Sequence, residues 1–259
     1  MTTTAGRLWN EAAAAQRYAR FRPDSFHGLV VERLRPWVAG RLPLRVAVDL
    51  GSGTGQSTRP LLALSQRVIG IEPSAAMRSL AEGGSGITYQ EGSGEATGLP
   101  DASVDLVSIG LAFHWMDATR AVPEIARILV SGGILAISNN GFVGVMTGQP
   151  AFGSWWKDYL SRHPTPKRNQ AVLTRELAVQ SGLQEIQAET RFEYQESFTA
   201  DRLAGYLATQ TNALEYLKTH DADASTWIAG ITASLQPLFP KPEMEFQFQG
   251  RLAVWRRSG

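Results

Sequence analysis

The sequence predicts an α/β protein built on a doubly wound, mostly parallel sheet. Short strand-like runs alternate with helical segments from residue 45 to residue 138, and this alternation is typical of parallel sheets with right-handed crossovers. The run Val104–Ile109 is almost continuously apolar, as expected for a strand that is buried on both faces. A glycine-rich turn directly follows Val46–Leu50. Open α/β sheets bind ligands at this kind of position, the carboxyl end of a strand.

The expected elements follow one another in a simple order. The first forty residues are predicted to be helical, because Ala12–Ala15 are strong helix formers and Phe26–Val38 has apolar residues at helical spacing. Ser74 is a suitable N-cap for a later helix. The expected strands are 46–50, 67–71, 87–90, 104–109 and 134–138, and the expected helices between them are 56–65, 74–81 and 120–129.

The alternation stops after residue 138. Residues 139–170 contain glycine, proline and large aromatic side chains without a clear strand. We expect no boundary between independent domains, because no linker rich in proline, serine and glycine is present. One domain over 1–259 is predicted, with a helical arm at 1–40 and a core at 45–138. Beyond the core, the pattern predicts a helix over 173–180, a strand over 185–194, two or three helices over 199–239, and one strand or a hairpin over 243–256.

The composition excludes several classes of protein. The 259 residues include 25 basic and 24 acidic side chains, a net charge of +1, which argues against a protein whose main task is to bind a nucleic-acid backbone. The absence of cysteine excludes disulfides, thiolate metal sites and cysteine nucleophiles. The apolar runs are too short to span a membrane, and the first twenty residues lack the apolar stretch of a signal peptide. A cytoplasmic protein is therefore expected.

The segment Val48–Gly55 is the most informative part of the chain. Its sequence is VDLGSGTG, with three glycines at alternate positions. Gly51 and Gly53 match the start of the dinucleotide fingerprint G-x-G-x-x-G, but Gln56 stands where the third glycine is required. The negative charge of Asp49 would also repel a pyrophosphate at this turn. A carboxylate here suits a ligand that has a positive group and no phosphate.

A second acidic residue, Glu72, ends the next expected strand, 21 residues after Gly51. An acidic side chain at this place can accept hydrogen bonds from both hydroxyls of a ribose. The two acids together indicate a ligand with a ribose and a cationic group. S-adenosylmethionine has both, because it contains an adenosine, a sulfonium and an ammonium.

Five motifs give the chain a resemblance to the class I S-adenosylmethionine-dependent methyltransferases, in the type 11-like group that acts on small molecules. Their order and spacing agree over the 93 residues from Val46 to Ser138. The motifs are VAVDLGSGTG (46–55), GIEPS (70–74), EGSGEATGLP (91–100), SVDLV (103–107) with His114-Trp115 after it, and ARILVSGG (126–133).

The resemblance implies a seven-stranded Rossmann-like sheet and a cofactor site. The turn at Gly51 and the side chain of Asp49 would hold the methionine part, Glu72 would bind the ribose, and Pro73 and Met77 would lie near the adenine. Met77 has core packing as its alternative role. The cofactor-binding residues implied in this sequence are Tyr18, Arg22, Asp49, Gly51, Ser52, Gly53, Gly55, Gln56, Glu72, Pro73, Met77, Ser93, Gly94 and Glu95.

Two of the matched segments, 93–94 and 18–23, each allow more than one role. Many relatives have Asp-Ala where this chain has Ser93-Gly94, so contact with the adenine amino group would depend on Ser93, on Glu95 or on backbone atoms. In similar proteins the leading helix folds over the cofactor, which implies that Tyr18 and Arg22 of YARFRP (18–23) approach the cofactor carboxylate. The alternative is that both are ordinary residues on a helix surface.

His114 and Trp115 follow the fourth expected strand, at the edge where a methyl acceptor would lie. The imidazole could take a proton from an attacking oxygen or nitrogen, and the indole N–H could hold an acceptor carboxylate. The third possibility is a packed pair that shapes the loop. A similar His-Trp pair occurs in several carboxyl methyltransferases and in relatives with other acceptors.

The resemblance further implies that the insertions at 139–170 and 199–240 form a helical cap over the acceptor. Aromatic side chains there could form the walls of a site for a flat, apolar molecule, or they could be the core of the cap itself. The candidate acceptor-binding residues are His114, Trp115, Trp155, Trp156, Tyr159, Tyr206 and Asn212. His27, His163 and His220 are scattered and suggest no metal site.

The resemblance implies transfer of a methyl group from S-adenosylmethionine to an oxygen or nitrogen of a small organic molecule, a carboxylate or an aromatic or heterocyclic metabolite. S-adenosylhomocysteine would be the second product, and no metal, membrane or nucleic acid would take part. One alternative is a protein that binds the cofactor without activity. A nicotinamide-dependent oxidoreductase is disfavoured by Gln56 and Asp49, and an RNA acceptor is disfavoured by the balanced charge.

Overall fold

The structure is a computed structural model that describes residues 11–166 and 172–259. Seven strands form one sheet in the order β3-β2-β1-β4-β5-β7-β6. Only β7 runs antiparallel to its neighbours in this sheet, so the predicted doubly wound, mostly parallel fold is confirmed. The strands are β1 (Leu44–Leu50), β2 (Ser65–Ile71), β3 (Ile87–Gln90), β4 (Val104–Gly110), β5 (Leu129–Met146), β6 (Leu183–Phe198) and β7 (Met244–Arg257).

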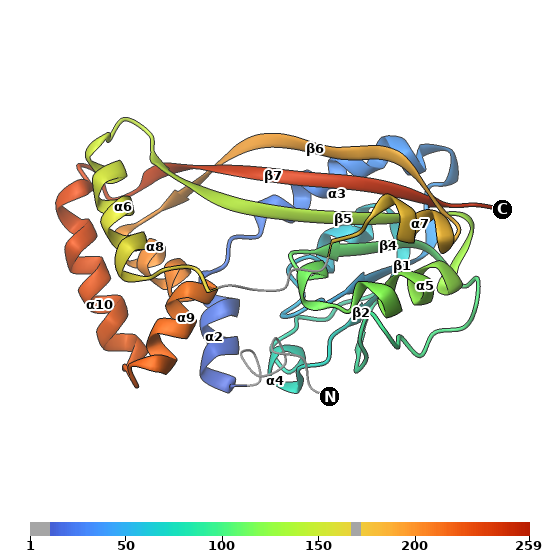
Figure 1. Cartoon of the computed structure of the whole chain (residues 1–259), viewed down its shortest axis with the longest axis horizontal. Helices are drawn as coiled ribbons and strands as arrows, with labels where there is room; N and C mark the ends of the chain where they lie inside the picture. The colour runs from blue at the N-terminus through green and yellow to red at the C-terminus, as the bar shows by residue number, and fades with distance from the viewer. Residues whose placement is uncertain (1–10, 167–171) are drawn as a thin grey trace.

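Helices flank the sheet and extend beyond one end of it (Figure 1). Those of the first half are α2 (Ala12–Phe21), α3 (Ser25–Val38), α4 (Ala75–Arg78) and α5 (Ala118–Ile128), and those of the second half are α6 (Ala151–Arg162), α7 (Arg175–Gln180), α8 (Ala200–Leu207), α9 (Thr211–Thr219) and α10 (Ala224–Leu235). Short 3-10 helices are η1 (Ala39–Arg41), η2 (Arg59–Ala63), η3 (Phe113–Trp115) and η4 (Gln236–Leu238). Across the described ranges, every helix is too short or too polar to cross a membrane.

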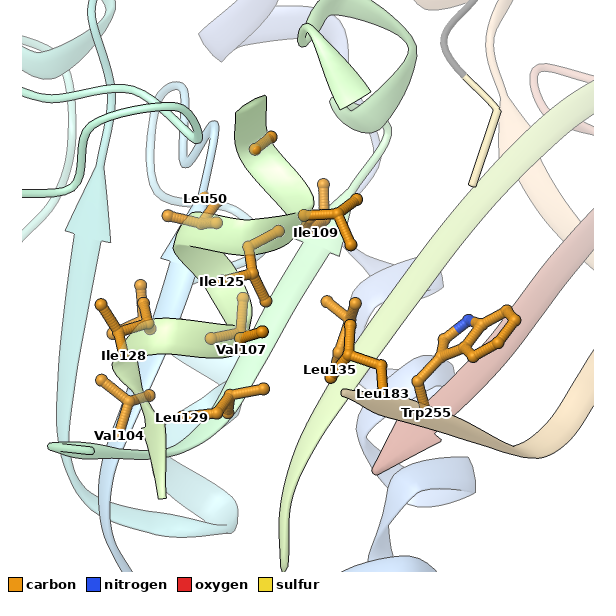
Figure 2. Close-up of a cluster of buried hydrophobic side chains, with 14 of the residues drawn as sticks. Leu50, Val104, Val107, Ile109, Ile125, Ile128, Leu129, Leu135, Leu183 and Trp255 are labelled. Atoms are coloured by element: carbon orange, nitrogen blue, oxygen red, sulfur yellow. The ribbon is translucent and has the colours of Figure 1, made fainter. Parts of the chain in front are cut away.

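The sheet is buried on both faces because its strands carry apolar residues at successive positions. In β1, Val48 packs into the layer formed with α5, while Ala47 packs into the opposite layer formed with α3. Side chains alternate between the faces of a strand, so one continuous apolar run supplies both layers. Figure 2 shows the first layer, where Ile125 and Ile128 of α5 lie against Val104 and Val107.

The predicted helix over 56–65 is wrong. Turns cover its first residues, and a short 3-10 helix, η2, follows. The hydroxyls of Ser57 and Thr58 both donate to Asp49 of β1, which holds these residues in turns against the end of that strand. Pro60 lies at the start of η2, since proline is tolerated only in the first turn of a helix.

The interpretation of 139–170 as a region without a strand is also wrong in its first part. Strand β5 continues to Met146 and pairs with β7, with Asn140 opposite Gly250 and Phe142 opposite Phe248. Asn-Asn-Gly is unfavourable for a strand in isolation, but pairing with a neighbouring strand overrides local preference. The first helical part of the predicted cap therefore begins only after Met146, where β5 ends. At the C-terminus, one long strand, β7, forms instead of the hairpin that the sequence also allowed.

Strands β5, β6 and β7 extend well past the other four and carry the cap at their far end (Figure 1). Helices α6, α8 and α10 pack there around an aromatic cluster that includes Phe152, Phe198 and Phe246. Helix α2 contacts both α8 of the cap and α4 of the core. The arm, which is α2, therefore lies between the core and the cap.

Candidate functional site

A cavity of about 870 Å³ lies at the carboxyl ends of β1, β2 and β4, beneath the cap. The sheet order places this cavity where the connections diverge to opposite sides of β1, which is the usual ligand site of an open α/β sheet. The predicted residues that line it are Tyr18, Arg22, Gly51, Gly53, Glu72, Pro73, Met77, Ser93, Gly94, Glu95, His114, Trp115, Tyr206 and Asn212.

Glu72 lies at the end of β2 with both carboxylate oxygens positioned by backbone N–H groups. Oε2 accepts from Gly53 at 3.0 Å, and Oε1 accepts from Ser74 at 2.9 Å. The side chain is buried, and burial raises the pKa of its carboxyl group, while the two backbone N–H bonds partly oppose that rise. Each oxygen keeps a second lone pair, so the carboxylate is pre-positioned to accept from paired hydroxyls of a ligand.

Asp49 is fully buried beneath the glycine turn and is absent from the residues that line the cavity. Its Oδ2 accepts from Ser57 Oγ at 2.6 Å and from Thr58 Oγ1 at 2.7 Å. Its Oδ1 has no hydrogen-bond partner among the described residues. Burial is the main reason that the pKa of Asp49 rises to about 6. Asp49 therefore joins β1 to the turn, and its buried charge would act on a cationic ligand through the turn without direct contact.

The glycine turn places its backbone close to neighbouring loops. Gly51 has a φ of +73°, and a Cβ there would come within 2.5 Å of Ala112 Cβ, so only glycine fits. Gly53 also lines the cavity. The predicted residues Ser52, Gly55 and Gln56 lie outside the lining. Gly55 faces the ring of Tyr89, and Gln56 Nε2 donates to the carbonyl of Arg22 at 3.0 Å.

Arg22 links the arm to the cap at the edge of the cavity. Its guanidinium donates to the carbonyl of Thr209 at 3.1 Å and lies over the rings of Tyr18 and Tyr206. Its Nε is buried with no hydrogen-bond partner in the described part of the chain. The guanidinium is therefore the cation at this end of the cavity that is suited to a carboxylate of a ligand.

The loop at 93–95 meets the loop that follows β4. Glu95 accepts from the backbone N–H of Asp117 at 2.7 Å. A Cβ on Gly94 would lie 2.5 Å from the sulfur of Met116. The departure from Asp-Ala therefore has a packing reason, because Met116 fills the space that an alanine methyl group would need.

His114 and Trp115 form η3 and line the cavity, with their ring centroids 4.8 Å apart. Tyr206 and Asn212 reach the cavity from the cap. Trp155, Trp156 and Tyr159 instead lie in the aromatic cluster of the cap, where Trp155 and Trp156 each stack on Tyr159. This is the packing arrangement that the sequence allowed as the alternative to an acceptor wall.

Several cavity residues were not identified from the sequence. Asn139, Asn140 and Phe142 belong to the part of β5 that was expected to be a loop, and Gln210 and Thr211 lie at the start of α9. Arg120 follows His114 by six residues and carried no pattern of its own. The sequence has no local signal for the extension of β5 past Ser138, because this extension depends on its pairing with β7. Within the described ranges, no group of three His, Asp or Glu side chains is arranged to hold a metal.

Comparison with known proteins agrees with this geometry. Residues 48–137 match the family model described as a methyltransferase domain. An uncharacterized methyltransferase of Mycobacterium bovis is 35% identical over 126 residues, 48% of this chain and 49% of that protein. A probable S-adenosylmethionine-dependent methyltransferase of Saccharomyces cerevisiae is 28% identical over 178 residues, 63% of this chain and 60% of that protein. The chain thus spans about half to three fifths of these relatives.

Solved structures share the fold over most of the chain. A protein of Anaeromyxobacter dehalogenans, described as a type II methyltransferase, superimposes with a TM-score of 0.64 at 24% identity, covering 91% of this chain and 96% of that one. The YcgJ protein of Bacillus subtilis gives a TM-score of 0.53 at 18% identity, covering 91% and 99%. Residues 48–137 form a methyltransferase domain, and over this domain the chain resembles the class I S-adenosylmethionine-dependent methyltransferases in sequence and in fold.

Proposed function

We propose that this protein transfers a methyl group from S-adenosylmethionine to an oxygen or nitrogen of a small organic molecule. The observation that carries the proposal is the Glu72 carboxylate, which lines the cavity while Gly53 and Ser74 hold both of its oxygens. It supplies paired acceptors for the ribose hydroxyls of the cofactor. Met77 and Pro73 line the cavity beside Glu72 and would contact the adenine.

The other end of the cavity suits the methionine part of the cofactor. The Arg22 guanidinium would bind its carboxylate, and Asp49, buried beneath the glycine turn, would contribute a negative charge on the side of its cationic groups. Backbone atoms of the turn at Gly51 and Gly53 come close enough to cradle the chain between these charges. The residues of this chain therefore fit the cofactor at three separate points.

When bound, S-adenosylmethionine supplies an activated methyl group and a good leaving group. The protein has to align the acceptor atom with that methyl group and exclude water. The cap, the arm and the long strands all contribute to the lining of the cavity, and His114, which lines it too, would receive a proton from a hydroxyl or ring nitrogen. A carboxylate acceptor would need no base.

The balanced charge of the chain, a net +1, favours a small acceptor over RNA. Cap residues such as Tyr206 and Asn212 line the cavity together with residues of the core. A protein that binds the cofactor without activity has the same cofactor contacts, so turnover is the feature that distinguishes the two possibilities.

Isothermal titration with S-adenosylmethionine and, separately, with NADH tests the cofactor. We expect binding of the first and none of the second, and the absence of binding at millimolar S-adenosylmethionine would overturn the proposal. Incubation with fractionated metabolite extracts, followed by mass spectrometry, tests the transfer. A metabolite that gains one methyl group only with active protein identifies the acceptor, whereas tight binding without any product would assign the protein to the inactive alternative.

A further inference from the structure

We infer that the acceptor is a flat, uncharged molecule with a hydroxyl or lactam N–H, and that Asn140 accepts a hydrogen bond from this group while Tyr194 holds Asn140 in position. The inference deepens the proposed function and rests on it. Asn140 lies in the part of β5 beyond Ser138, and Tyr194 lies on β6, with β7 between these two strands.

The register of the sheet brings Asn140 to the acceptor side. Gly110 at the end of β4 pairs with Ser138 of β5, and the N–H of Leu111 donates to the carbonyl of Ser138 at 3.0 Å. Strand β4 then ends and its chain turns into η3 with His114, while β5 continues straight on (Figure 1). The continuation of β5 therefore runs alongside the loop of His114 and lines the same cavity.

The orientation of the Asn140 amide follows from its partner. Its Nδ2 donates to the Tyr194 hydroxyl at 2.7 Å. Tyr194 is itself held between aromatic rings, with centroids 5.8 Å from Phe26 and 5.4 Å from Phe248. The bond from one N–H to Tyr194 fixes the orientation of the amide, which leaves the carbonyl Oδ1 available as an acceptor. It suits a ligand that donates a hydrogen bond.

The charge of the cavity is unevenly distributed. The charged side chains of its lining come from α2 and from the carboxyl ends of β2, β3 and β4, namely Arg22, Glu72, Glu95, Asp117 and Arg120. The lining that β5 and the cap contribute, within the described ranges, consists of Asn, Gln, Thr, Gly, Phe and Tyr. A carboxylate or an ammonium beside Asn140 would lose its hydration without a charged side chain of β5 or the cap to pair with, which is costly. The Arg22 guanidinium, which lies over Tyr206, is the group proposed to bind the cofactor carboxylate.

Two aromatic side chains complete the acceptor side. Phe142 and Tyr206 both line the cavity and both belong to the aromatic cluster of the cap, with centroids 6.4 Å apart and planes at 87°. Tyr206 is 2% exposed, whereas Phe142 is only partly buried. A flat molecule can therefore lie against Phe142 while its donor group meets Asn140.

Four naphthalene probes that differ only in one substituent test this inference: 2-naphthol, 2-methoxynaphthalene, 2-naphthoate and 2-naphthylmethylammonium. Their binding to the full chain loaded with S-adenosylhomocysteine is measured by calorimetry. We expect 2-naphthol to bind about tenfold more tightly than each of the other three, the effect of one good hydrogen bond. Equal binding of the methoxy probe, tighter binding of either charged probe, or no binding of 2-naphthol would overturn the inference.

Variants separate a recognition role from a merely structural one. Asn140→Leu is expected to remove the preference for 2-naphthol over 2-methoxynaphthalene, and Tyr194→Phe to reduce it, while both keep the wild-type affinity for S-adenosylhomocysteine. Gln195→Leu, on the exposed neighbouring position of β6, is the matched control and should keep the preference. An unchanged preference in Asn140→Leu would overturn the inference alone, whereas failure of S-adenosylhomocysteine to bind the wild type would overturn the proposed function as well.

Discussion

The carboxylate of Glu72 accepts the backbone N–H of Gly53 at 3.0 Å, which joins the end of β2 to the turn that follows β1. This contact couples the position of the carboxylate that we propose for ribose binding to the conformation of the glycine turn. Glu72→Gln keeps the size of the side chain but removes its charge and one acceptor. We expect a loss of cofactor affinity of about 1–3 kcal/mol, the usual range for hydrogen bonds to a charged group.

Calorimetric titration of Glu72→Gln with S-adenosylmethionine measures this loss. Glu32→Gln, an exposed change on α3, is the control and should bind as the wild type does. A wild-type dissociation constant for Glu72→Gln would contradict the assignment of Glu72 to the ribose.

Gly94→Ala tests the contact between the two loops at 93–95 and 111–117. The added methyl group would meet Met116 Sδ at 2.5 Å, so the Met116 side chain or the loop that carries it has to shift and cofactor affinity should fall. The double variant Gly94→Ala/Met116→Ala removes the obstruction and should recover most of the affinity, as a coupled pair does in a double-mutant cycle. Gly83→Ala, where the added group meets no atom within 4 Å, is the control. Additive effects of the two changes would refute the steric explanation.

Asp49 makes the stability of the unliganded protein depend on pH. Burial raises its pKa from 3.8 to about 6, so between these values the folded state holds a proton that the unfolded chain has released. This contribution to the free energy of unfolding is therefore present at low pH and is lost as the pH rises through about 6, by at most about 3 kcal/mol. Asp49→Asn should raise the melting temperature more at pH 8 than at pH 5. The same change in melting temperature at both pH values would show that Asp49 does not titrate in this range.

The same titration should affect ligand binding in the opposite direction. A cationic ligand favours ionised Asp49, so the dissociation constant for S-adenosylmethionine should increase as the pH falls below about 6. Asp49→Asn should flatten this profile. A steep profile that persists in the variant would assign the pH dependence to another group, such as Glu72.

Gly205 sets the distance between the arm and the cap. A Cβ at this position would lie 2.3 Å from the ring of Phe21, so Gly205→Ala should displace α2 and with it Arg22. We expect a loss of stability of about 1–3 kcal/mol from overpacking, together with weaker cofactor binding. Gly230→Ala on α10 meets no neighbouring atom and should stabilise the fold by up to about 1 kcal/mol through helix propensity. Equal thermal stabilities of the two variants would show that the arm adapts freely.

His114→Ala separates chemistry from cofactor binding. His114 belongs to η3 and lines the cavity. If it acts as a general base, the variant should lose turnover by roughly 10²–10⁴-fold. Its affinity for S-adenosylmethionine should stay the same. The rate of methyl transfer to the acceptor found in the extract screen measures the effect. His220→Ala, at an exposed position after α9, is the control. Wild-type turnover in His114→Ala would assign His114 to packing against Trp115.

The sequence predicted the parallel core and several cavity residues at the ends of β1 and β2 because its signals there are local. Other expected residues, namely Asp49, Ser52, Gly55 and Gln56, lie outside the lining. A buried apolar run, a glycine turn and an acid at the strand end each act within a few residues, and Gly51, Gly53 and Glu72 all reach the cavity as expected. The helix expected at 56–65 failed because Ser57 and Thr58 bond to a residue of the preceding strand. Helical spacing in the sequence contains no information about that contact.

The acceptor half depended on contacts between segments far apart in the chain. Asn140 became a strand residue only through its pairing with Gly250, and it acquired a defined orientation only through Tyr194. Trp155 and Trp156 could have faced a ligand or formed part of the core of the cap. Packing of the cap helices on the long strands placed them in the aromatic cluster. Sequence alone determined the parallel core and its glycine turn, since local patterning specifies them. Tertiary structure decided which polar and aromatic side chains face the cavity, because burial and pairing between distant segments select one of several orientations that the local sequence allows equally.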